Sequence, residues 1–135
     1  MRLDLSRVGQ IALSTADTDR AERFYEDALG LRKLFRFGTL VFFDCAGLRL
    51  MIAQSDDAEA IARASPLYFR CADIALATHE LKARGVVFVD EPHRIAEMDD
   101  HDLWMAFFRD PDEHLMALMQ EAPKGYAPAT EAASP

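Results

Sequence analysis

The densest group of side chains able to do chemistry lies between Asp90 and Asp102. This stretch of thirteen residues holds six carboxylates and two imidazoles: Asp90, Glu91, His93, Glu97, Asp99, Asp100, His101, Asp102. Such a set can bind a metal ion or supply a general base, with His101 oriented by Asp100 or Asp102. The alternative is a solvated acidic hairpin loop in which His101 titrates like any surface histidine. We favour the loop and keep His101 as the catalytic candidate of the stretch.

The sequence shows no clear signal for a cysteine or serine nucleophile or for a phosphate-binding loop. Cys45 and Cys71 are not spaced as a CxxC pair and fit buried core positions in a reducing compartment. No GxSxG motif and no glycine-rich phosphate loop is present. His79 is expected on the wet side of a helix and His114 in a turn, both with structural roles.

The elements that must position these side chains begin with a strand, a helix and three further strands. Alternation predicts the first strand over 7–14. Asp17 sits where a helix N-cap belongs, and Gly30 is a stop signal. Between them, apolar residues recur at the spacing of one helical face: Ala21, Phe24, Tyr25, Ala28, Leu29. Residues typical of strands then fill 34–43 and 48–53.

The same order starts again after a polar linker at 54–65, which has room for a turn or two of helix before Pro66. A strand is expected over 67–71, followed by a helix that Asp73 caps and Gly85 stops. Further extended runs follow: 86–89, 94–98, 103–108, 115–119. The repeated pattern predicts one domain over 1–121, made of two modules at about 7–54 and 66–121, with 122–135 as a mobile C-terminal tail.

Composition narrows the possible partners. The chain of 135 residues carries 15 Lys and Arg against 23 Asp and Glu, a net charge of -8, which repels nucleic acid and anionic lipid surfaces. No apolar run approaches the roughly 20 residues that cross a bilayer, and the N-terminus does not resemble a secretory signal. We therefore expect a cytoplasmic protein with no nucleic-acid or membrane partner.

Two stretches resemble a known family. In the first, 11–31, the Asp17 cap is followed by Arg20-Ala21, Phe24-Tyr25 and Leu29-Gly30-Leu31, as in the first module of the vicinal oxygen chelate superfamily. The second, 107–112, is similar to the phenylalanine and Asp-Pro signature before its last strand. That superfamily includes glyoxalase I, extradiol dioxygenases, fosfomycin-resistance enzymes and bleomycin-resistance proteins. The resemblance covers about 7–121 and implies an α+β fold, two βαβββ modules packed around a shared cup.

The resemblance also implies where metal ligands would lie. In metal-using members, the first and last strands of both modules supply four ligands, and these positions fall on Gln10, Pro66, Ala117 and either Met51 or Ile52. Gln10 alone has a ligand-capable side chain. Because one neutral amide oxygen does not hold a divalent ion against water, we expect the usual metal centre to be absent and no cofactor to be needed.

What remains is binding in the cup. Strand alternation and the resemblance place these residues on its wall: Gln10, Ala12, Ser14, Tyr68, Arg70, Leu115, Ala117. Arg70 can grip a carboxylate or phosphate oxygen, although it can equally pair with a surface acid. Tyr68 can stack on a ligand or be an ordinary core aromatic. Trp104 can reach the cup or a subunit contact.

The sequence therefore predicts a protein that binds a small, partly apolar organic molecule without metal, as in the bleomycin-resistance branch. The rival hypothesis is a metal-dependent lyase or dioxygenase-like enzyme with unconventional ligands, among them Gln10 and His101. The resemblance further implies a homodimer.

Overall fold

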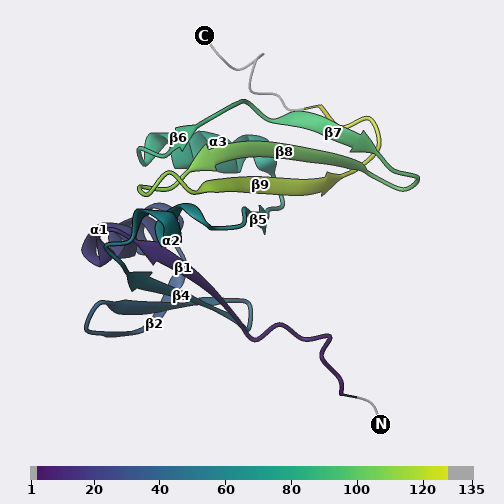
Figure 1. The fold of residues 1–135 in the computed structure, drawn as a ribbon. Helices are drawn as coiled ribbons and strands as arrows, with labels where there is room; N and C mark the ends of the chain where they lie inside the picture. The colour runs from purple at the N-terminus through teal and green to yellow at the C-terminus, as the bar shows by residue number, and fades with distance from the viewer. Residues whose placement is uncertain (1–2, 128–135) are drawn as a thin grey trace. The chain divides into compact units, whose positions relative to one another are not determined.

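The computed structural model describes residues 3–127, and the chain divides between Ala64 and Ser65 into two compact units. Each unit is built on its own β-sheet, and both contain helical segments, so the fold is α+β as predicted (Figure 1). None of the helices within 3–127 is long and apolar enough to cross a membrane.

The first unit follows the predicted order of strand, helix and three strands. Its sheet has the strand order β1-β4-β3-β2, in which β1 and β4 run parallel and the other neighbours antiparallel. The elements are β1 (Gln10–Thr15), α1 (Thr18–Arg23), the π-helix η1 (Phe24–Ala28), β2 (Arg32–Phe37), β3 (Leu40–Cys45), β4 (Leu48–Gln54) and α2 (Ala58–Ala62).

The predicted first helix is confirmed, but it changes type halfway. From Phe24 the backbone widens into a π-helix, in which the Leu29 N–H donates to the Phe24 carbonyl at 3.0 Å. Tyr25 lies in this segment and is buried, with its ring 6.0 Å from that of Phe43 on β3. Of the apolar residues at helical spacing, Ala21 and Tyr25 are buried, whereas Phe24, Ala28 and Leu29 are partly exposed.

The second unit has the strand order β5-β9-β8-β6, with β7 also paired to β8. Both short strands lie along β8, so β6 and β7 together occupy the place of one edge strand. Helix α3 packs against β8 and β9. The elements are β5 (Leu67–Arg70), α3 (Ile74–Ala83), β6 (Val87–Phe88), β7 (His93–Glu97), β8 (Asp102–Arg109) and β9 (Leu115–Ala122).

Both main helices begin in the same way. The predicted caps are confirmed, because the Asp17 carboxylate accepts from the Arg20 N–H and the Asp73 carboxylate from the Leu76 N–H, each at 3.1 Å. A glutamine at the end of the last strand adds a second bond in each unit. Gln54 Oε1 accepts from the Thr18 N–H at 3.1 Å, and Gln120 Oε1 from the Ile74 N–H at 2.8 Å. These bonds tie the start of each helix to the final strand of its unit.

The core of each unit lies between the helix and one face of the sheet. In the first unit the buried side chains on this face include Leu13, Val41, Phe43, Leu50 and Ile52. In the second unit they include Ile74, Leu81, Phe108, Met116 and Leu118. The opposite face of each sheet is left for other contacts, and the residues predicted to bind a ligand lie there.

The segment that follows β9 is anchored where the structure describes it. Ala122 ends β9, the Lys124 ammonium donates to the buried Asp102 carboxylate at 2.9 Å, and the Gly125 N–H donates to the same carboxylate at 3.2 Å. Tyr126 packs edge-on against Trp104, with ring centroids 5.5 Å apart. The rest of the predicted tail, 128–135, lies outside the described residues.

Candidate ligand-binding faces

The sheet of the first unit has one face opposite the helices, called here the first open face. Strand alternation puts the predicted residues Gln10 and Ser14 of β1 on it, since Leu13 and Thr15 point into the core. Strand register adds neighbours, because Gln10 pairs with Arg49 and Phe42 with Met51. The residues of this face used below are Gln10, Ala12, Ser14, Phe35, Phe42, Arg49 and Met51.

Gln10 is held from two sides on this face. Arg49 Nε donates to Gln10 Oε1 at 2.8 Å, and Gln10 Nε2 lies 3.8 Å from the Met51 sulfur. Because a guanidinium only donates hydrogen bonds, the Gln10 atom facing it must be the amide oxygen. Arg49 also lies over the Phe42 ring, with its guanidinium carbon 5.6 Å from the ring centroid, and Phe42 stacks on Phe35 at 4.4 Å.

This arrangement does not suit a divalent cation. The implied ligand position on β4 belongs to Met51, because Ile52 is buried on the helix side. The donors near Gln10 are then one amide oxygen, already bonded to Arg49, and one thioether. Hard ions prefer carboxylates and softer ones imidazole or thiolate, and the guanidinium charge repels either kind. The face is better suited to an anion or to a carbonyl oxygen.

The second unit has an equivalent face opposite α3, called the second open face. It is defined by Tyr68, Arg70, Met105, Phe107, Leu115, Ala117, Met119 and Glu121. Tyr68 packs edge-on against Phe107, with centroids 6.1 Å apart, above the fully buried Ala117. Arg70 forms an ion pair with Glu121 at 3.1 Å, and its side chain is 69% exposed. The predicted residues of this unit therefore share one face, and Arg70 already has an acidic partner there.

The acidic stretch forms the hairpin between β7 and β8. His101 Nδ1 lies 2.8 Å from the Asp100 carboxylate, and this hydrogen bond lowers the pKa of Asp100. The predicted alternative orienter, Asp102, instead binds Lys124, which lowers the pKa of Asp102. Within the described residues, this stretch brings no three metal-ligating atoms together. His101 therefore has an orienting carboxylate, but it is part of a surface hairpin.

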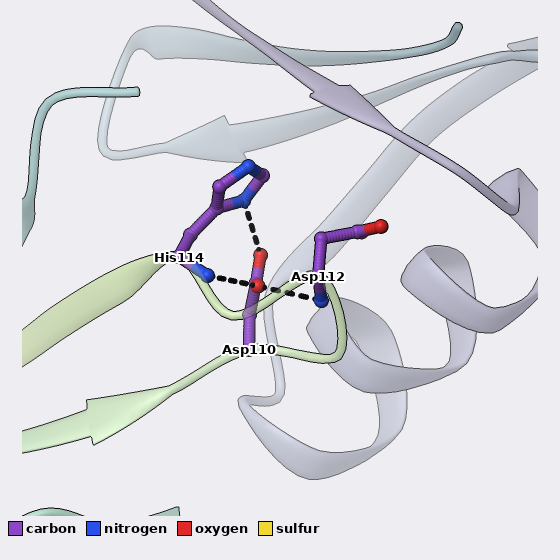
Figure 2. Close-up of side chains that lie close together, drawn as sticks. All are labelled: Asp110, Asp112 and His114. Carbon is purple, nitrogen blue, oxygen red and sulfur yellow. Dashed lines mark hydrogen bonds and ion pairs between the residues drawn. The ribbon is translucent and has the colours of Figure 1, made fainter. Parts of the chain in front are cut away.

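The turn between β8 and β9 contains a cluster that the sequence analysis did not single out. One ligand atom each from Asp110, Asp112 and His114 lie within 4.8 Å of one another. Asp110 and His114 are buried, and Figure 2 shows the Asp112 side chain pointing away from the His114 ring. The sequence did offer a signal for this cluster, because Asp110, Asp112 and His114 occupy alternate positions.

The hydrogen bonds of this cluster stabilise the turn. Asp110 Oδ1 accepts from the backbone N–H groups of Asp112 and His114, each at 2.9 Å, and Oδ2 lies 2.7 Å from His114 Nδ1. A cation held between Asp110 and His114 Nδ1 would have to displace the hydrogen bond that joins them. The predicted structural role of His114 is consistent with this geometry.

Neither cysteine has the environment of a nucleophile. Burial is the main cause that raises the pKa of the Cys45 thiol, with Asp44 adding to it. Burial likewise raises the pKa of Cys71, with a further contribution from Asp73. A raised pKa keeps both thiols protonated at neutral pH, and a thiol attacks only as the thiolate.

A shallow hollow lies beside the carboxyl ends of β1 and β4. It is lined by Ala16, Thr39, Gln54, Ser55, Asp56, Ala58 and Ile61. None of the residues predicted to bind a ligand is among them. Ser55 and Gln54 already bond to the backbone of Asp57 and Thr18 at the starts of α2 and α1. We therefore assign the hollow no role in binding.

Comparisons with known proteins identify the family of this chain. Residues 7–118 match the model of the Glyoxalase/Bleomycin resistance protein/Dioxygenase superfamily. The chain belongs to this superfamily. The predicted resemblance and the predicted fold class are both confirmed. No curated protein matches the chain.

Several solved structures share the fold of this chain. An integron cassette protein from V. cholerae is 19% identical with a TM-score of 0.72, covering 90% of this chain and 100% of its own. Lactoylglutathione lyase from Agrobacterium tumefaciens is 21% identical, with a TM-score of 0.69 and coverage of 91% and 99%. A glyoxalase/bleomycin resistance protein/dioxygenase from Alicyclobacillus acidocaldarius is 22% identical, with a TM-score of 0.68 and coverage of 89% and 95%. At these identities the likeness concerns the fold, and function depends on the site residues.

Proposed function

We propose that this superfamily member binds a small, partly apolar organic molecule on its open sheet faces, without a metal ion. The observation that carries the proposal is the contact between Arg49 and Gln10. At the position where metal-using relatives are expected to have a ligand, the amide oxygen is bonded to a guanidinium instead. The Arg49 guanidinium at this position attracts anions and carbonyl oxygens.

The surroundings of this contact suit an organic molecule. Phe35, stacked on the buried Phe42, provides flat apolar area, and Ser14 adds a hydroxyl on the same face. Binding sites for small molecules generally combine apolar walls with a few directed polar groups. The first open face has both.

The second open face supports the same proposal. Tyr68 and Leu115 offer apolar surface with one phenolic hydroxyl, whereas the predicted Ala117 is fully buried and offers none. Arg70 can contribute to binding through the donors that its contact with Glu121 leaves, or by exchanging Glu121 for the ligand. An Arg70→Ala variant tests that contribution directly, because unchanged ligand affinity would remove Arg70 from the binding site.

Metal dependence is tested on the purified protein. We expect no stoichiometric metal by elemental analysis, and no large shift of the thermal midpoint when Ni²⁺, Mn²⁺, Fe²⁺ or Zn²⁺ is added. A stoichiometric metal, or a stabilisation that both a chelator and Gln10→Ala abolish, would contradict the proposal.

A metal-dependent lyase or dioxygenase-like enzyme is the second candidate, and the Asp110, Asp112 and His114 cluster is the observation that favours it. The metal titration separates this candidate as well. If the cluster binds the ion, stabilisation by metal is lost in Asp112→Asn and retained in Gln10→Ala. Asp112 is the variant of choice because Asp110 also holds the turn.

We further propose that the protein is a cytoplasmic homodimer, as the family resemblance implies. The net charge of -8 favours a small-molecule ligand over nucleic acid or an anionic membrane.

A further inference from the structure

We infer that Arg49 is the anchor for a carboxylate group, and that the ligand of the first open face is a flat aromatic carboxylate. The inference rests on the proposed function and specifies the ligand class. It depends on how Arg49 is oriented, on which of its donors remain, and on what lies beside it.

Arg49 is held in one orientation by two different contacts. Its Nε donates to Gln10 Oε1 at 2.8 Å, and its guanidinium lies over the Phe42 ring at 5.6 Å. These contacts use one of the five N–H donors of the guanidinium. The terminal nitrogens carry the other four, in the planar fork that matches both oxygens of a carboxylate.

No ion pair within residues 3–127 involves Arg49. The acid opposite it in the strand register is Asp44, whose carboxylate accepts from the Gly47 N–H at 3.0 Å instead. The positive charge on the first open face is therefore available to a bound anion.

The surface beside this charge is aromatic. Phe35 stacks on Phe42 with an interplanar angle of 23°, and Phe35 is 47% exposed whereas Phe42 is buried, so Phe35 supplies the exposed ring. Met51 lies on the same face between Ala12 of β1 and Phe42 of β3. A thioether such as that of Met51 also packs well against aromatic rings. A flat ring can lie on these side chains while its carboxylate reaches Arg49.

Two probes of the same shape test the inference on the full-length protein. 2-Naphthoate carries a carboxylate, and 2-naphthamide replaces it with a neutral amide. Each is titrated while the NMR signals of the Met51 and Ala12 methyl groups are followed, because these methyls belong to the first open face. The variant is Arg49→Gln, and the control is Arg23→Gln, an exposed helical arginine whose substitution changes the net charge equally.

The wild type is expected to bind 2-naphthoate at least tenfold more tightly than 2-naphthamide, with shifts at the Met51 methyl. Arg49→Gln removes this preference by weakening naphthoate binding about tenfold, while Arg23→Gln keeps it. Arg49→Lys, which retains charge without the fork, keeps part of the preference.

The possible outcomes distinguish failure of the carboxylate anchor from failure of the proposed binding function. If both probes bind the wild type equally, or if Arg49→Gln retains the preference, the carboxylate anchor is wrong and the proposed binding function stands. If neither probe binds, the proposed function and this inference are both contradicted for aromatic molecules of this size. Thermal midpoints of the variants near that of the wild type show that loss of binding is not loss of folding.

Discussion

Gln10 has two roles on the first open face. Its amide oxygen accepts a hydrogen bond that orients Arg49, and the residue stands at the implied metal-ligand position. Its substitution by glutamate tests this arrangement. In Gln10→Glu a carboxylate would form an ion pair with the Arg49 guanidinium and compete with a bound anion. We expect 2-naphthoate affinity to fall about tenfold and 2-naphthamide affinity to stay nearly unchanged, as measured by NMR titration. Gln10→Ala is the control: it frees Arg49 without neutralising it, so a smaller loss is expected. A larger loss in Gln10→Ala than in Gln10→Glu would contradict this interpretation.

Asp110 is a second residue whose role can be separated by substitution. Its buried carboxylate accepts from two backbone N–H groups and faces the ring of His114. Asp110→Ala leaves these donors without their acceptor, and we expect it to lower the free energy of unfolding by about 2–4 kcal/mol in urea denaturation. Asp27→Ala, at an exposed aspartate, serves as the control and leaves the urea midpoint nearly unchanged. A loss of less than about 1 kcal/mol in Asp110→Ala would show that the cluster does not exist chiefly to hold the turn.

At the scale of elements, the turn after β8 contains a backbone conformation that its residue type disfavours. Glu113 has a φ of 68°, in the left-handed region where a side chain is strained and glycine is not. We expect Glu113→Gly to raise the free energy of unfolding by about 0.5–1 kcal/mol in urea denaturation, because relief of roughly 1–2 kcal/mol of left-handed strain exceeds the backbone entropy that glycine costs. Glu113→Ala, which keeps a Cβ, should bring no such gain. A destabilised Gly variant would indicate that the Glu113 side chain contributes more than its backbone conformation costs.

The contact between Asp102 and Lys124, called here the C-terminal anchor, leads to a prediction about how stability depends on pH. Lys124 donates to Asp102 and holds the pKa of that carboxyl below its usual range. Because the folded-state pKa is the lower one, the stabilisation is complete above the unfolded value, near 4, and is lost as the pH falls through the folded value. The sole tryptophan, Trp104, packs against Tyr126 and reports this loss by fluorescence. In Lys124→Met the acid transition should move to higher pH.

The matched control for this transition is Lys82→Met, which removes an ion pair with Glu91 away from the anchor. Its acid transition should coincide with that of the wild type. If Lys124→Met leaves the midpoint of the Trp104 signal unmoved, the ammonium does not hold Asp102 ionised.

The elements also show what could be predicted from the sequence. Asp17 and Asp73 act on backbone three residues away, so local spacing predicted both caps. Gln54 and Gln120 reach helices far away in the chain, and local spacing does not reveal such contacts. Arg49 was missed for the same reason, since it meets Gln10 only through the parallel register of β1 and β4. Alternation within strands was enough to put the predicted ligand-binding residues of each unit on one face.

At the scale of the whole molecule, the superfamily was recognisable from short motifs, whereas its chemistry depends on a few site residues. The proposed homodimer is tested by size-exclusion chromatography with light scattering. We expect a mass of twice the 15.2 kDa of one chain. A mass of one chain across the working concentration range would reject the dimer and would leave binding to a single chain's open faces unaffected.

The central claim is that an organic ligand, and no metal, occupies the first open face. Its most direct test is titration of the protein with 2-naphthoate in the presence and absence of excess EDTA, followed at the Met51 methyl signal. The account predicts the same saturable shift and the same affinity under both conditions. Binding that requires metal and disappears with EDTA would contradict it.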